Sequence, residues 1–162
     1  DAIRAWTNGQ KVDVRHPNAT RPWQHVLEPL SGYLWLGAQL LREAQNVRGE
    51  AFNFGPDASV NQTVGELLSA MAQQWPGAAW QSQAAVTTAG SEAMLLKLTC
   101  DKALHYLQWQ PLLSFAETVA LTADWYLAWH QKQPDMAAVT QRQIEYYTSH
   151  AEEKGFAWAS RA

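Results

Sequence analysis

The segment Arg21-Pro-Trp-Gln-His-Val-Leu-Glu-Pro-Leu-Ser-Gly-Tyr-Leu34 joins a short extended stretch to a helix. Pro29 suits the first turn of a helix, and an acid beside it, Glu28, is favoured there by the helix dipole. Leucines then recur at helical spacing, which predicts a helix over residues 29–45. Loops between strands and helices of α/β folds often hold ligands. The segment therefore predicts a helix and, just before it, a candidate binding site.

Outward from this segment, short apolar stretches alternate with longer amphipathic ones, a pattern typical of α/β proteins. Four stretches read as short strands, the last of them as either a strand or a loop: residues 12–16, 51–55, 80–86 and 95–98. Residues 1–6 and 100–107 have helical spacing. The expected fold class is α/β, mostly helical with short strands.

Three possible capping boxes, in which a Ser or Thr is followed three residues later by Glu or Gln, precede periodic segments. They are Thr63–Glu66, Ser114–Glu117 and Thr140–Gln143. Each predicts the start of a helix, because the two side chains satisfy backbone N–H groups of the first turn.

Composition narrows the function classes. The 162 residues carry a net charge of −3, and no run of Lys and Arg offers the basic stripe that a nucleic-acid partner needs. No apolar run reaches the length of a membrane span, so no membrane partner is expected. Cys100 is the one cysteine, which excludes an intrachain disulfide and favours a reducing, cytoplasmic setting.

Arg21, held between a proline and Trp23, is suited to bidentate contact with a diphosphate. The alternative is that Arg21 caps backbone carbonyls or pairs with Glu28. His25 and Glu28 have a spacing that could share a metal on a helix, but prolines at 22 and 29 frame an extended segment. We therefore expect a structural histidine and no metal site.

Several motifs are absent from the sequence. The glycines form no dinucleotide-binding fingerprint, no tyrosine is followed four residues later by lysine, and no G-x-S-x-G elbow or P-loop occurs. The chain therefore contains no NAD-binding motif and no complete set of catalytic residues.

The stretch Arg21–Leu34 closely resembles a signature of CDP-glucose 4,6-dehydratases, a branch of the extended short-chain dehydrogenases/reductases. Further blocks agree: Phe52-Asn-Phe-Gly-Pro56, Leu96-Lys-Leu-Thr-Cys-Asp-Lys-Ala103 and Leu107-Gln-Trp-Gln-Pro111. The likeness covers nearly the whole chain except about the last ten residues. It implies the carboxyl-terminal part of a Rossmann-type fold, and residues 1–162 would form the substrate-binding portion.

The resemblance also implies a parent enzyme whose amino-terminal domain, absent here, binds NAD and carries the catalytic Tyr and Lys. That enzyme would dehydrate CDP-glucose to a 4-keto-6-deoxy sugar nucleotide, and this chain alone would be inactive. On this analogy Arg21 contacts the substrate diphosphate, Trp23 and His25 shape the pocket wall, and Glu92 lies close to the nucleotide.

The sequence departs from the family at Ala89-Gly-Ser-Glu-Ala-Met-Leu-Leu96, where the family has a histidine-rich stretch. Three alternatives stay open: a relative that binds another nucleotide, a non-catalytic binding or structural module, and an epimerase of the same superfamily. In the family, the helix after Pro29 and the strand at Phe52 would belong to the sheet of the missing NAD domain. Because both would then expose apolar surface, we expect the chain alone to form oligomers or aggregates.

Overall fold

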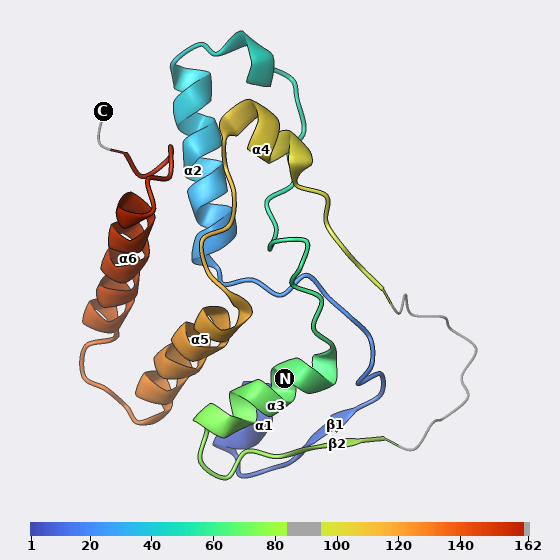
Figure 1. Cartoon of the computed structure of the whole chain (residues 1–162). Helices are drawn as coiled ribbons and strands as arrows, with labels where there is room; N and C mark the ends of the chain where they lie inside the picture. The colour runs from blue at the N-terminus through green and yellow to red at the C-terminus, as the bar shows by residue number, and fades with distance from the viewer. Residues whose placement is uncertain (84–94, 161–162) are drawn as a thin grey trace.

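The computed structural model describes residues 1–83 and 95–160, and these form a mostly helical α/β structure (Figure 1). In chain order the elements are α1 (Ala2–Thr7), β1 (Val12–Val14), α2 (Leu27–Leu41), the 3₁₀ turn η1 (Gln45–Val47), α3 (Val64–Gln74), β2 (Trp80–Ser82), α4 (Asp101–Leu107), α5 (Phe115–His130) and α6 (Met136–Glu153). The predicted fold class is confirmed.

Strands β1 and β2 pair in parallel, with Val12 opposite Trp80. Parallel neighbours need a long crossover connection, and here α2 and α3 lie within it. Helices α1, α3 and α5 pack with this sheet around a first core of Trp6, Val14, Leu68, Met71, Trp75, Val119 and Ala123. The Trp6 indole N–H donates to the carbonyl of Ala79, which ties α1 to the start of β2 (2.9 Å).

A second core lies between α2 and α4 and is built around Phe54 and Trp109, whose rings meet edge to face at 4.9 Å. Gly32 of α2 lies against Phe54, because a Cβ at this glycine would be 2.2 Å from the phenyl Cδ1. The strand predicted over residues 51–55 is wrong: this segment forms no strand in the described part of the chain. Its apolar residues, Phe52 and Phe54, pack against helices.

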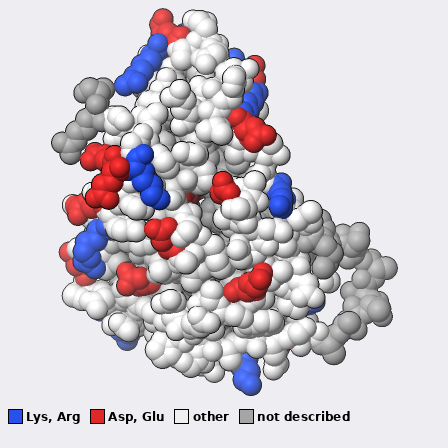
Figure 2. Space-filling view, viewed as in Figure 1, with Lys and Arg blue, Asp and Glu red and all other residues white. Residues whose placement is uncertain are grey.

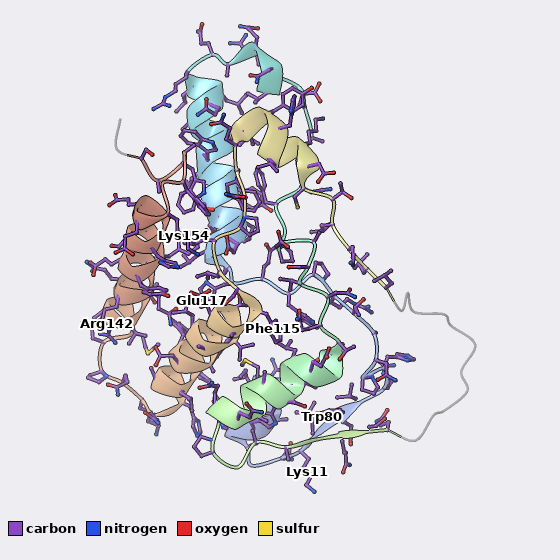
Figure 3. The ribbon with its side chains drawn as sticks, in the orientation of Figure 1. Lys11, Trp80, Phe115, Glu117, Arg142 and Lys154 are labelled. Atoms are coloured by element: carbon purple, nitrogen blue, oxygen red, sulfur yellow. The ribbon has the colours of Figure 1, made fainter. Side chains whose placement is uncertain are left out.

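Two of the three predicted capping boxes are confirmed. Thr63 with Glu66 caps α3, and Ser114 with Glu117 caps α5, where Glu117 is labelled in Figure 3. The third is wrong, because α6 already begins at Met136.

Asp135 is the residue that caps α6, and its Oδ1 accepts a hydrogen bond from the backbone N–H of Ala138 (2.8 Å). Thr140 lies inside the helix, with its hydroxyl bonded to the carbonyl of Met136. A Ser/Thr-x-x-Gln pattern therefore does not by itself locate a helix start when an acid five residues earlier can cap the helix.

Other predicted boundaries shift by a few residues. The helix expected over 29–45 begins and ends earlier, at Leu27 and Leu41, and Glu43 beyond it has a left-handed φ of 60°. The strands expected over 12–16 and 80–86 are shorter, and the second prediction extends past the described residues. Of residues 95–98, Leu95 alone makes a bridge, with Thr20.

The second core is joined to α6 by the carboxylate of Glu28, which is 1% exposed. Its Oε1 accepts from the backbone N–H groups of Leu112 and Leu113 at 3.0 and 2.6 Å. Its Oε2 lies 2.9 Å from the hydroxyl of Tyr147 on α6, and that hydroxyl also lies 3.0 Å from Ser31 Oγ. One side chain of α2 thus fixes both the entry to α5 and the position of α6.

Burial raises the pKa of the Glu28 carboxyl, and the backbone N–H groups of Leu113 and Leu112 act in the opposite direction. Burial also raises the pKa of Tyr147, as does the nearby Glu28 charge. The two donated backbone bonds compensate part of the cost of removing this carboxyl from water.

One side of α2 remains uncovered. Its exposed apolar residues, here called the α2 stripe, are Leu30, Tyr33, Leu34, Leu40 and Leu41, and Leu34 is 76% exposed. Glu28 is the one charged residue of this helix, and it is buried. Figure 2 shows broad uncharged areas between scattered charges on one face of the molecule. None of the helices in the described residues is both long and apolar enough to cross a membrane.

Replacing Glu28 tests the role of its carboxylate. We expect Glu28→Gln to lower the free energy of unfolding by about 2 kcal/mol or more, because a buried donor left unsatisfied costs roughly 1–3 kcal/mol. Leu112 N–H lies 3.0 Å from Oε1 and 3.1 Å from Oε2, so the amide NH₂ would face this donor in either orientation of the glutamine. Urea denaturation followed by circular dichroism measures the change. Glu66→Gln is the matched control, since glutamine also serves at that capping position, and equal stability of the two variants would contradict the account.

Candidate functional site

Arg21 follows a point where three segments meet. Thr20 bridges Thr63 on one side and Leu95 on the other, so the chain enters the predicted binding segment between two neighbouring stretches. The half-buried guanidinium donates from Nη1 to the carbonyl of Thr20 at 2.7 Å. Carbonyl capping, one alternative foreseen for this residue, is therefore present. Its predicted contact with a diphosphate stays a prediction.

Trp23 is fixed to the loop that precedes α3. Its indole N–H donates to the carbonyl of Gln62 at 3.0 Å. The ring lines a cavity of about 260 Å³ that residues of α1, α3 and α5 also line. The side chain of Trp23 therefore links its own segment to a loop 39 positions later in the sequence.

His25 is buried, with 7% of its surface exposed. Its Nδ1 accepts from the backbone N–H of Leu27 at 3.3 Å, which assigns the ring proton to Nε2 in the neutral form. Burial lowers the pKa of this imidazole and favours the neutral form. The carboxylate of Glu28 turns into the core and away from a shared ion, and no group of three possible metal ligands occurs among the described residues.

A cavity of about 420 Å³, here called the His25 cavity, opens where the binding segment meets α5 and α6. Helix α5 contributes Thr122, Trp125 and Tyr126 to its lining, and α6 contributes Thr140, Gln143 and Ile144. Bonds between the two helices hold these walls: the Trp125 indole N–H donates to Thr140 Oγ1 at 2.9 Å, and Gln143 Nε2 donates to the carbonyl of Leu121 at 2.8 Å.

The structure brings some of the predicted site residues together and not others. Trp23 and His25 line two neighbouring cavities that share Gln24 and Thr122. Arg21 is absent from the described lining of both. Glu92 lies outside the described residues.

The cavity walls from α5 and α6 were not foreseen as site residues. Trp125 and Gln143 sit in ordinary helical patterns, and Thr140 was assigned to a helix cap. The contacts that reveal them join positions more than one hundred residues apart in the sequence, from His25 to α6. No local signal identifies such contacts.

The buried imidazole predicts a pH effect on stability. Because the folded pKa of His25 lies below its ordinary value of 6.5, the stability that depends on neutral His25 is present above about pH 6.5 and is lost as pH falls through the folded pKa. Between about pH 7.5 and about pH 5, we expect the free energy of unfolding to fall less in His25→Asn than in wild type. The asparagine Oδ1 can still accept the hydrogen bond from the backbone N–H of Leu27. His105→Asn, at an exposed histidine, is the control, and identical pH profiles for wild type and His25→Asn would contradict the shift.

Comparisons with known proteins bear on the identity of the chain. No family model matches it. It is 37% identical over 150 residues to CDP-glucose 4,6-dehydratase of Salmonella typhimurium (strain LT2). That match covers 92% of this chain and 41% of the relative, so the chain spans less than half of the relative's length.

Among solved structures, UDP-glucuronic acid 4-epimerase from Bacillus cereus, crystallised with UDP-glucuronic acid and NAD, is similar at a TM-score of 0.61 and 17% identity. The match covers 78% of this chain and 38% of that one, and at this identity it shows a shared fold. In sequence the chain is thus similar to CDP-glucose 4,6-dehydratase over 41% of that protein's length, and in fold it is similar to part of UDP-glucuronic acid 4-epimerase.

Proposed function

We propose that residues 1–162 are the substrate-binding portion of a nucleotide-sugar 4,6-dehydratase, a lyase that converts CDP-glucose to CDP-4-keto-6-deoxyglucose in deoxysugar synthesis. The observation that carries the proposal is the 37% identity to such an enzyme across 92% of this chain. A cytoplasmic location belongs to the same proposal and rests on the one cysteine of the sequence.

NAD does not fit the residues of this chain, because the sequence has no glycine fingerprint to hold a dinucleotide. In the proposed enzyme a second, amino-terminal lobe would bind NAD, which would take a hydride from the sugar and return it after water is lost. The Tyr and Lys of the reaction would also come from that lobe. The chain alone would therefore bind substrate without converting it.

The proposed role of this chain is to hold the nucleotide sugar. Arg21 would contact the diphosphate, with Trp23 and His25 in the pocket wall and Glu92 near the nucleotide. Two observations support the first role: Arg21 directly follows Thr20, where three segments meet, and its guanidinium donates to the carbonyl of Thr20. A guanidinium presents five N–H donors in a planar fork that suits bidentate contact with a diphosphate.

The α2 stripe supports the proposed second lobe. An uncharged helix side with Leu34 three-quarters exposed is a surface that folded proteins usually cover. Gly37, on the same helix, has no atom within 4 Å of the position of a Cβ, which leaves room for another backbone to approach closely.

A non-catalytic module remains a second candidate, and the sequence at residues 89–96 favours it, because the histidine-rich stretch of the family is replaced there. Such a module would bind a nucleotide sugar, CDP-linked or otherwise, without joining a dinucleotide-binding lobe. Comparing CDP-glucose with UDP-glucose in the titration below also tests which nucleotide is preferred.

Removing the guanidinium tests the substrate contact. We expect Arg21→Ala to weaken CDP-glucose binding by about 10- to 100-fold in isothermal titration calorimetry, since hydrogen bonds to charged groups contribute roughly 1.5–3 kcal/mol each. Arg142→Ala, an exposed arginine on α6, is the control and should bind like wild type. Unchanged affinity in Arg21→Ala would remove this residue from the site.

The assembly state tests the second lobe. We expect the chain alone to form oligomers or aggregates in sedimentation velocity, and to become a one-to-one complex when co-expressed with the amino-terminal lobe of the Salmonella relative. Leu34→Glu should abolish that complex because it places a charge in the α2 stripe. Leu104→Glu, an exposed leucine on α4, should leave it intact. A monodisperse monomer that unfolds cooperatively and does not bind the amino-terminal lobe would contradict the proposal.

A further inference from the structure

The lining of the His25 cavity includes polar side chains that can bond to a ligand. His25 lines the cavity, is 7% exposed, and has Nδ1 engaged by the backbone N–H of Leu27. The neutral ring then carries its proton on Nε2, for which no partner occurs within the described residues. Among the described residues, Gln24 Oε1 in the same lining is a buried acceptor without a hydrogen-bond partner, which costs free energy unless a ligand or water donates to it.

The walls of the cavity combine apolar surface with few, well-held polar groups. The indole of Trp125 forms an apolar part of the wall. Its N–H already donates to Thr140 Oγ1, so it needs no acceptor on a ligand. Gln143, also 7% exposed, is held by its bond to the carbonyl of Leu121. A volume of about 420 Å³ lies in the range of pockets for small ligands. This mixture suits a ring with apolar faces and hydroxyl edges.

The cavity mouth lies beside the uncovered side of α2. Val26, Tyr126 and Ile144 form part of the lining and are 61%, 37% and 44% exposed. Leu27 and Ile144 also line an adjoining groove between α2 and α6 that reaches Leu30 and Leu34 of the α2 stripe. A ligand in the cavity would therefore lie next to the surface on which a second lobe would dock.

The cavity also lies within reach of the proposed diphosphate contact. Arg21 and His25 are four residues apart, and four extended residues span at most about 14 Å. A nucleotide sugar whose diphosphate contacts Arg21 could therefore place one of its two ends in the cavity.

Resting on the proposed function, we propose that the His25 cavity receives the hexose ring of the nucleotide sugar. His25 Nε2–H donates to a hexose oxygen, and Trp125 and Ile144 contact the apolar faces of the ring. The walls supplied by α5 and α6 then determine which hexose is accepted. The open side of the cavity leaves the ring accessible to a second lobe.

A variant that fills the cavity distinguishes the contribution of the hexose to binding from that of the rest of the ligand. Calorimetric titrations of the full chain with CDP-glucose and with CDP are compared for wild type, Ile144→Trp and Arg142→Trp. We expect wild type to bind CDP-glucose at least about tenfold more tightly than CDP. Ile144→Trp, which places a large ring at the cavity mouth, should remove that difference and leave CDP affinity unchanged. Arg142→Trp, an equally large change at an exposed position of the same helix, should preserve it.

Each outcome decides a different point. Equal wild-type affinities for CDP-glucose and CDP, or an Ile144→Trp variant that keeps the full difference, would overturn the hexose site and leave the proposed function standing. Parallel losses for both ligands in Ile144→Trp would overturn it too, because the cavity would not act on the sugar alone. No binding of either ligand to folded wild-type chain would overturn the proposed function, and the hexose site with it.

Discussion

The fold depends on one buried carboxylate. Glu28, at the start of α2, accepts from the backbone N–H groups of two consecutive residues, Leu112 and Leu113, and meets Tyr147 of α6. A carboxylate accepts through both of its oxygens, whereas an amide of the same size replaces one acceptor oxygen by an NH₂ donor. The entry to α5 and the face of α6 are thereby fixed against the segment that contains His25. The His25 cavity exists because these three parts are held together.

Helix α2 has apolar residues on a packed side and on an exposed side. On the packed side, Gly32 has no side chain and so allows the ring of Phe54 to lie against the helix. The α2 stripe is exposed and bears no charge. Hydrophobic burial drives association of such surfaces as it drives folding. The α2 stripe is therefore the surface on which the proposed second lobe would dock.

The sequence predicts much of the local structure and little of the site. Helix starts at Thr63 and Ser114 follow from side-chain chemistry within four residues, and both are found. The same pattern misleads at Thr140, because Asp135 offers an earlier cap. The stretch around Phe54 has strand-like composition, but its place in the structure depends on α2 and Trp109, far away in the sequence. The bond of Glu28 to Tyr147 spans 119 positions and leaves no local trace.

The most direct measurement of the central claim is a chimera in which this chain replaces the matching part of the Salmonella CDP-glucose 4,6-dehydratase. Mass spectrometry of its reaction with CDP-glucose would detect a product lighter than the substrate by one water. The account predicts that product, at a lower rate than the natural enzyme gives. A chimera that folds, binds NAD and CDP-glucose and yet forms no dehydrated sugar nucleotide would contradict it.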